Sequence, residues 1–333
     1  MGEPAGRAPG ALRSGHVLGI DSGGSGLRIA VARADDAEAR PLATRASHEP
    51  VRTGPAGIDA DHLLSQLLPA AEELGREAGA HGFAAVCVGA AGMATLGEDL
   101  RARLPAALAT AFGVHHLALA ADAVTAYAGA LGQRPGAVVA AGTGMIALGT
   151  DLTAVGGWRR ADGWGHLLGD CGGGAWTGRA GLEAALRAYD GRPGGSAALL
   201  ARAEAVFGPV AGLPGALYPR PDRPAVLASF APEVARCADE NDAVALGIMR
   251  AAAGHIADAA AAVCPPGAGT AVACTGGLFG LGEPLLAPLR TALAERGAGA
   301  PPPPPPAPPP PGGVPSPPPG PINKEHTRPS ADC

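Results

Sequence analysis

Residues 17–31 decide the fold, and they read Val-Leu-Gly-Ile-Asp-Ser-Gly-Gly-Ser-Gly-Leu-Arg-Ile-Ala-Val. Two apolar runs flank a glycine-rich turn, which predicts a β-hairpin. Glycine adopts backbone angles that are closed to other residues, so the turn can point its N–H groups at an anion. We therefore interpret Gly23, Gly24 and Ser25 as a phosphate-binding tip. An ordinary glycine-rich hairpin is the alternative, because one glycine cluster alone is a weak signal.

The carboxylate of Asp21 stands at the end of the first apolar run, where it is suited to hold Mg²⁺, usually through water, beside phosphate oxygens.

A second copy of the pattern occupies residues 137–149, which read Ala-Val-Val-Ala-Ala-Gly-Thr-Gly-Met-Ile-Ala-Leu-Gly. The hydroxyl and backbone N–H of Thr143, between Gly142 and Gly144, suit a second phosphate contact. The recurrence indicates an internal repeat of domain size.

A third carboxylate ends an apolar run between the two hairpins. Residues 116–122, His-Leu-Ala-Leu-Ala-Ala-Asp, predict a strand that leads into a helix starting at Ala123. Ligands gather at the carboxyl ends of strands in parallel α/β sheets, so Asp122 is a candidate general base for a substrate hydroxyl. The alternative is that Asp122 only caps the following helix.

Residues 156–179 carry the most specific pattern, with Asp-Gly-Trp-Gly-His-Leu-Leu-Gly-Asp at 162–170. This segment resembles the GGWGxxxGDEGSxxxxG signature of the N-acetylglucosamine kinase and BadF/BadG ATPase family. The paired hairpins resemble those with which the sugar kinase, Hsp70 and actin superfamily holds ATP. The resemblance covers residues 17–293 and implies an α/β fold of two actin-like (ribonuclease H-like) domains around a cleft for ATP and sugar.

The resemblance also implies roles for single residues. Asp122 matches the Asp of the family's Asn-Asp-Ala motif, which makes it the catalytic base and a sugar contact. A carboxylate at Asp170 would accept two sugar hydroxyls with charge-assisted strength. The other implied positions are a backbone contact to the sugar ring at Gly163, a substrate contact at Met145, where relatives often have Ser, and an adenosine-binding turn at Gly276 and Gly277.

The departures from the family pattern include Leu27, Ala121 in place of an Asn, Met145, and Cys171 in place of a Glu. Sugar-kinase relatives also have a hexose-contacting Asn in the region after the third strand. Here His48 or Glu49 occupies that neighbourhood. These departures leave open which sugar is accepted and whether catalysis is retained.

The resemblance, taken with these features, implies an ATP- and Mg²⁺-dependent kinase that phosphorylates the 6-hydroxyl of N-acetylglucosamine or a related hexosamine. A BadF-type ATPase that energises a partner protein is the second reading. A sugar- or nucleotide-binding regulator with impaired catalysis is the third. The chain lacks a Gly-x-x-x-x-Gly-Lys-Ser/Thr loop, which argues against the P-loop NTPases.

The composition sets further limits. The 333 residues, of which 47% are hydrophobic and 17% charged, suffice for two domains that each bury a core. A net charge of −5 gives no basic footprint, so we expect a small-molecule sugar and not nucleic acid as partner, with a homodimer left open. The six cysteines form no Cys-x-x-Cys pair, which argues against a zinc or iron–sulfur cluster. No apolar run reaches the ~20 residues that span a bilayer, and no signal peptide is evident, so a cytoplasmic location away from membranes is expected.

Pattern and composition predict four segments. They are a flexible N-terminus at 1–14, an actin-like domain at 15–131, a second such domain at 132–298, and a proline-rich tail at 299–333 that is extended or disordered. Helices are expected at 58–80, 98–112, 177–189, 197–207, 223–237, 241–263 and 285–295. We expect the second of these helices to be kinked or broken near Pro105, which cannot donate a backbone hydrogen bond.

Overall fold

The computed structural model describes residues 15–23, 26–36, 40–47, 49, 52–54, 57–90, 93, 97–114, 116–153, 155–266 and 270–297. The segments predicted at 1–14 and 299–333, and with them Gly24, Ser25 and His48, lie outside the described residues.

The amino-terminal half builds a five-stranded sheet in the order β3-β2-β1-β6-β7. β1 and β2 form the predicted hairpin, in which Gly23 pairs with Gly26. β1, β6 and β7 run parallel, and β3 points the same way because it is antiparallel to β2. Four strands therefore end at one edge of this sheet. The strands are β1 (His16–Gly23), β2 (Gly26–Arg33), β3 (Pro41–Ser47), β6 (Phe83–Ala90) and β7 (Leu117–Ala121), and a separate small ladder joins β4 (Thr53–Gly54) to β5 (Gly57–Ile58).

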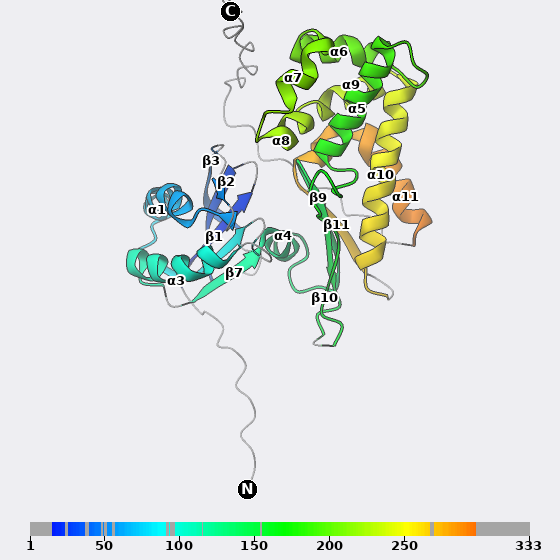
Figure 1. Ribbon diagram of the computed structural model, residues 1–333. Helices are drawn as coiled ribbons and strands as arrows, with labels where there is room; N and C mark the ends of the chain where they lie inside the picture. Colours follow the sequence, from blue (N-terminus) through cyan, green and yellow to red (C-terminus); the bar gives the residue numbers. More distant parts are fainter. Residues whose placement is uncertain are drawn as a thin grey trace, which may run out of the picture.

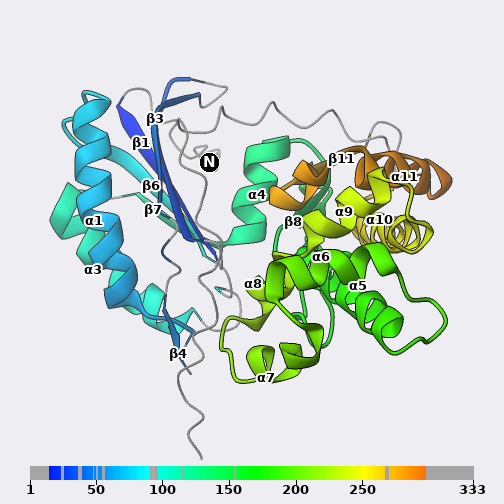
Figure 2. The same ribbon diagram turned by 90° about the horizontal axis from the view of Figure 1, so that it is seen from above.

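Two helices, α1 (Ala60–Glu77) and α3 (Glu98–Phe112), cover one face of this sheet, as Figure 2 shows. Asp59 starts α1 by accepting a hydrogen bond from the backbone N–H of His62. α3 runs through Pro105 without interruption, so the predicted break is wrong. Its buried side chains recur every fourth residue and hold the helix in the core despite the missing N–H: Leu100, Leu104 and Leu108.

The second sheet has the order β10-β9-β8-β11, which repeats β3-β2-β1-β6 strand for strand. The pairing senses also agree, since β8–β9 and β9–β10 are antiparallel and β8–β11 is parallel. The internal repeat read from the two glycine turns is therefore present in the topology. The strands are β8 (Gly136–Ala141), β9 (Met145–Thr150), β10 (Trp158–Asp162) and β11 (Ala271–Thr275).

Helices dominate the rest of the second half (Figure 1). They are α5 (Gly174–Tyr189), α6 (Ala197–Phe207), η1 (Val210–Gly212), α7 (Leu213–Leu217), α8 (Arg223–Ala228), α9 (Ala231–Asp239), α10 (Ala243–Val263), η2 (Gly277–Leu281) and α11 (Glu283–Glu295). The single helix expected at 223–237 is two, because Pro232 near the start of α9 cannot continue a preceding helix. Within the described residues, we find no helix with the length and apolar character that crossing a membrane requires.

The helix α4 (Asp122–Leu131) lies between the two sheets (Figures 1 and 2). It packs against β1, β6 and β7 of the first sheet and against β8, β9 and β11 of the second. Its buried residues Ala123, Tyr127 and Leu131 form one cluster with Val138, Leu148 and Ala273. α4 therefore connects the carboxyl edge of the first sheet to the body of the second.

α5 and α8 approach so closely at Gly178 that a Cβ there would overlap the carbonyl oxygen of Leu227. We expect Gly178→Ala to lower the free energy of unfolding by roughly 1–3 kcal/mol, because the helices must move apart. Gly254→Ala, inside α10, is the matched control, since its Cβ would meet nothing within 4 Å. The control should raise stability by ~0.5–1 kcal/mol through helix propensity. Calorimetric melting of both variants checks this, and equal shifts would contradict the packing argument.

Candidate functional site

Two carboxylates meet at the carboxyl edge of the first sheet. Asp21 on β1 pairs with Gly89 on β6, and the next residue of β6, Ala90, pairs with Ala121 at the end of β7. Asp122 follows directly. Burial is the main cause that raises the pKa of Asp122, and the negative charge of Asp21 raises it further, while a hydrogen bond from Ala123 acts in the opposite direction. The two carboxylates are therefore close enough for their charges to interact.

The interpretation of Asp122 as a helix cap is wrong. The cap residue of α4 is Ala121, which makes no side-chain hydrogen bond, and Asp122 is the first helical residue. Its Oδ1 accepts a 2.8 Å hydrogen bond from the adjacent N–H of Ala123. A capping side chain would instead accept from an N–H two or three positions further on. Asp122 therefore does not occupy the cap position, and its side chain accepts one free N–H of the first turn.

The environment of Asp21 is polar and open. Nη1 of Arg28 lies 3.5 Å from Oδ2 of Asp21, and both side chains are exposed. Exposed ion pairs contribute little to stability, so this contact can be exchanged for another cation at small cost. The neighbouring Ser22 hydroxyl is buried and has no hydrogen-bond partner among the described atoms. The predicted tip residues Gly24 and Ser25 lie outside the described residues, and Gly23 ends β1.

The second glycine turn is held by the start of α5. Within the turn, the N–H of Gly142 donates to the carbonyl of Gly144 at 2.9 Å. The N–H groups of Gly174 and Ala175 donate to the carbonyls of Gly142 and Thr143, both at 2.8 Å. These bonds turn the carbonyl groups of the loop toward the helix and fix its conformation. A phosphate-binding turn needs such rigidity, because its N–H groups must be aimed before the anion arrives.

The glycine pair after β11 lies beside this turn. Thr275 at the end of β11 pairs with Ala140 near the end of β8. Gly276 has a φ of 107°, and a Cβ at this position would overlap the carbonyl oxygen of Ala141. Gly277 begins η2. The structure therefore brings the second and third predicted nucleotide-contacting segments, residues 142–144 and 276–277, to one edge of the second sheet.

Asp170 contacts the same turn. Its Oδ1 accepts a 3.0 Å hydrogen bond from the N–H of Gly165, and its Oδ2 lies where a Cβ on Gly144 would be. Burial is the main cause that raises the pKa of Asp170, the Gly165 N–H opposes this, and the charge of Asp162 adds to the rise. Gly163 has a φ of 73° and lies against the side chain of Ile146. Gly163 and Asp170 thus belong to one loop beside the second turn.

The side chain of Met145 does not belong to this surface. It is 2% exposed and packs in the hydrophobic core of the second half. The side chain that was expected to contact substrate is therefore a core side chain, because the alternation of β9 points residue 145 inward. The tryptophans divide similarly, since Trp176 packs against the core whereas Trp158 and Trp164 are exposed.

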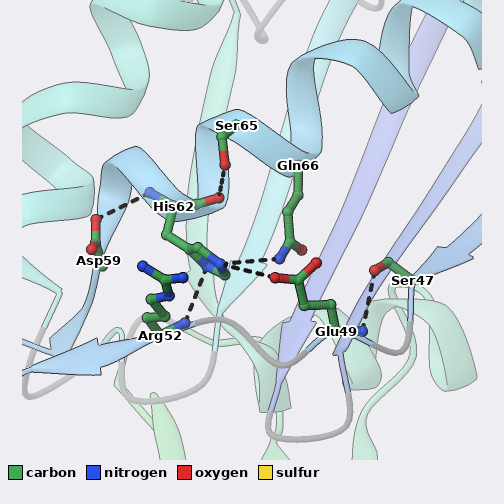
Figure 3. Close-up of polar contacts among 7 residues, drawn as sticks. All are labelled: Ser47, Glu49, Arg52, Asp59, His62, Ser65 and Gln66. Carbon is green, nitrogen blue, oxygen red and sulfur yellow. Dashed lines mark hydrogen bonds and ion pairs between the residues drawn. The ribbon is translucent and has the colours of Figure 1, made fainter.

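Sequence reasoning missed His62, which organises the loop after β3 (Figure 3). Its Nδ1 accepts a 3.2 Å hydrogen bond from the N–H of Arg52, and its Nε2 lies 3.3 Å from Oε1 of Glu49 and 3.5 Å from Nε2 of Gln66. The His62 side chain is only 11% exposed. No local pattern predicts this cluster, because the loop folds back over α1. Glu49, which was expected near the sugar, is engaged by His62.

The comparisons with known proteins agree with this architecture. The sequence profile of the BadF/BadG/BcrA/BcrD ATPase family matches residues 18–308. The chain belongs to this family. Membership implies the use of ATP, and the fold is that of the actin-like sugar kinases.

Three proteins illustrate the similarity. An N-acetylmuramic acid/N-acetylglucosamine kinase of Clostridium acetobutylicum is 30% identical over 184 residues, a match that spans 53% of this chain and about half, 55%, of that relative. The structure of a candidate N-acetylglucosamine kinase of Chromobacterium violaceum is 28% identical, with a TM-score of 0.61 over 86% of this chain and 94% of that one. A ROK family glucokinase of Streptomyces griseus, in complex with glucose and AMPPNP, shares the fold with a TM-score of 0.52 at 20% identity, over 86% and 91% of the two chains.

Removal of the His62 side chain should loosen the loop between β3 and α1. We expect His62→Ala to accelerate tryptic cleavage after Arg52, because the backbone N–H of Arg52 loses its partner. His81→Ala, which removes an exposed histidine from the turn after α1, is the control and should leave cleavage at Arg52 unchanged. Mass spectrometry of a digestion time course measures the rate, and equal rates for the two variants would show that His62 does not hold the loop.

Proposed function

We propose that this protein is an ATP-dependent kinase that transfers the γ-phosphate to the 6-hydroxyl of N-acetylglucosamine or a related hexosamine. The observation that carries the proposal is the pair of electrostatically coupled carboxylates, Asp21 and Asp122, at the end of β1 and β7. Phosphoryl transfer to an alcohol needs one group to accept the hydroxyl proton and another to organise the phosphate charge. Asp122 would supply the first, and Asp21 would supply the second by holding Mg²⁺.

Asp122 is the general base in this proposal. Its pKa is raised by burial and by Asp21, which makes it a better proton acceptor than an ordinary carboxylate. It would accept the proton of the sugar hydroxyl as that oxygen attacks the γ-phosphorus, and the bond from the γ-phosphorus to the β–γ bridging oxygen breaks, releasing ADP.

ATP would lie between the two glycine turns, with its phosphates on Gly23, Gly24 and Ser25 and on Gly142, Thr143 and Gly144, and its adenosine against Gly276 and Gly277. Mg²⁺ characteristically takes one or two carboxylates together with water and phosphate oxygens, and the exposed carboxylate of Asp21 would suit that requirement. Asp21 is the carboxylate that would hold it. When bound, Mg²⁺ would neutralise phosphate charge.

The sugar would bind between Asp122 and Asp170, with the backbone of Gly163 against its ring. Asp170 has one oxygen bonded to Gly165 and the other beside the second glycine turn, so it can accept sugar hydroxyls next to the phosphate site. The amino-sugar specificity is supported by the names of two relatives, the N-acetylmuramic acid/N-acetylglucosamine kinase and the candidate N-acetylglucosamine kinase. A cytoplasmic location would suit this use of ATP.

The family match itself favours a second candidate, an ATPase that energises a partner protein. The two candidates differ in one measurable quantity. A kinase releases ADP in proportion to sugar phosphate, whereas such an ATPase releases ADP and inorganic phosphate without a sugar product. Coupled ADP release with N-acetylglucosamine, N-acetylmuramic acid, N-acetylmannosamine and glucose, followed by mass detection of the product, separates them.

Replacement of the base tests the mechanism directly. We expect Asp122→Asn to lower sugar-dependent ADP release by roughly 10²–10⁴-fold, because the amide cannot accept the hydroxyl proton. Asp239→Asn, at the exposed end of α9, is the isosteric control and should keep the wild-type rate. An unchanged rate for Asp122→Asn would rule out the general-base role.

The raised pKa of Asp122 also predicts how the reaction rate falls on the acidic side of the pH–rate profile. The base works only when ionised, so the rate should be complete above the pKa and fall as the pH drops through it. Because burial and Asp21 raise that pKa, the midpoint should lie above the ordinary aspartate value of ~3.9. Initial rates at saturating substrates between pH 4 and 8 locate it. A midpoint at or below the ordinary value would contradict the electrostatic argument.

A further inference from the structure

Asp170 lies in the loop of residues 162–171, and one side chain holds the two ends of this loop together. Asp162 stands at the end of β10, and its Oδ1 accepts a 2.5 Å hydrogen bond from the N–H of Asp170. Its Oδ2 accepts a 3.0 Å hydrogen bond from the N–H of Cys171. A single carboxylate thus joins the first residue of the loop to its last two. Hydrogen bonds to an ionised acceptor are among the stronger ones in proteins.

Arg160 fixes the backbone where β10 leads into this loop. Nε of Arg160 donates to the carbonyl of Asp162 at 3.0 Å, and Nη2 donates to the carbonyl of Gly163 at 2.7 Å. The guanidinium also lies over the ring of Trp164, 4.4 Å from its centroid. The carbonyl groups of Asp162 and Gly163 are thus held while the carboxylate of Asp162 joins the two ends of the loop.

The loop contributes little to the core, so the hydrogen bonds of Asp162 fix the loop itself and add little to the packing of the core. Trp164, Leu167 and Leu168 are 67%, 81% and 86% exposed. Asp162 and Asp170 both adopt a positive φ, 60° and 54°, a region that non-glycine residues rarely occupy. Strain of this kind persists only where surrounding contacts impose it, and here the contacts are those of the Asp162 carboxylate.

We propose that Asp162 is the positioning residue for Asp170. It fixes the backbone of residues 170–171, so that the Asp170 carboxylate is held against the second glycine turn, ready to accept sugar hydroxyls. This inference rests on the proposed function and adds to it a residue that touches neither sugar nor nucleotide. It also predicts that damage at residue 162 affects sugar binding and spares ATP binding.

Two substitutions at Asp162 test the inference. Asp162→Gly keeps the positive φ accessible and removes both hydrogen bonds, whereas Asp162→Asn keeps the size and one acceptor and turns the other acceptor into a donor. We expect the KM for the sugar to rise roughly 10- to 100-fold in Asp162→Gly and less in Asp162→Asn, since hydrogen bonds to charged groups are lost. The KM for ATP should stay within about twofold of wild type, and the melting temperature should change little because the loop lies outside the core.

The matched control is Asp151→Asn. Asp151 also accepts a backbone hydrogen bond, from Thr153 at 2.9 Å, and the hydrogen bonds that it makes with described residues lie within the β9–β10 turn. It should leave both KM values unchanged. If Asp151→Asn raised the sugar KM as Asp162→Asn does, the effect would be a general one of the β9–β10 hairpin and the inference would fail.

A pH measurement separates positioning from mere support of the fold. Burial is the main cause of the raised pKa of Asp170, and the charge of Asp162 adds to it, while the Gly165 N–H, His166 and Arg160 lower this pKa. Asp170 must be ionised to accept two hydroxyls, so the sugar KM rises as the pH falls through its pKa. Removal of the Asp162 charge should move that rise to lower pH. An unshifted profile would count against contact between the two carboxylates.

The variant Asp170→Asn distinguishes failure of this inference from failure of the proposed function. If Asp170→Asn raises the sugar KM and both Asp162 variants behave as wild type, the positioning role is refuted and the sugar site stands. If Asp170→Asn has no effect on any sugar, the proposed sugar site itself is wrong. If the Asp162 variants lose sugar and ATP binding together, or fail to fold, Asp162 is a structural residue and the inference is overturned.

Discussion

The packing of α4 between the two sheets is the constraint on which the rest of the structure depends. Tyr127 shows how tightly the helix is held, because its hydroxyl donates to the carbonyl of Arg134 at 2.6 Å and its ring stacks edge-on against Trp158. On the opposite side, Thr125 lies where any side chain on Gly89 of β6 would have to go. A helix in contact with both sheets cannot shift alone. The carboxylate at its first residue is therefore fixed by the same contacts that join the two halves.

This arrangement concentrates negative charge where a polyanion is proposed to bind. Asp21, Asp122, Asp162 and Asp170 all lie at the ends of strands or loops that meet the two glycine turns, and burial and mutual repulsion raise the pKa of Asp122 and Asp170. Phosphate groups alone would be repelled by such a surface. The backbone N–H groups of the turns and a divalent cation are the two sources of positive charge that would offset the repulsion. If the polyanion binds as proposed, a metal–nucleotide complex would therefore be favoured over the free nucleotide on electrostatic grounds.

The sequence predicted the parts of this structure that local chemistry determines. Both hairpins, the internal repeat and most helices followed from apolar spacing and glycine turns. What escaped prediction depends on contacts between distant segments. The role of His62 arises only when the loop after β3 folds over α1, and Asp162 acquires its partners only when residues 163–169 turn back on β10. The burial of Met145 was likewise hidden, because a strand next to a glycine turn can face either way.

Cys171 lies at the point where the two ends of the loop of residues 162–171 are joined. The resemblance predicts a glutamate there, and burial raises the pKa of the Cys171 thiol, which keeps this side chain neutral. A neutral group at that position removes a carboxylate from the loop. Asp162 supplies one from the adjacent strand end and directs both of its oxygens to backbone N–H groups of the same two residues, Asp170 and Cys171. The loss at 171 therefore does not leave the loop without an anion, because the carboxylate that fixes the backbone enters from β10. Since the Asp162 carboxylate is engaged with N–H groups, Asp170 is the one of these two carboxylates with an oxygen against the second turn, and the proposed sugar contact would depend on it.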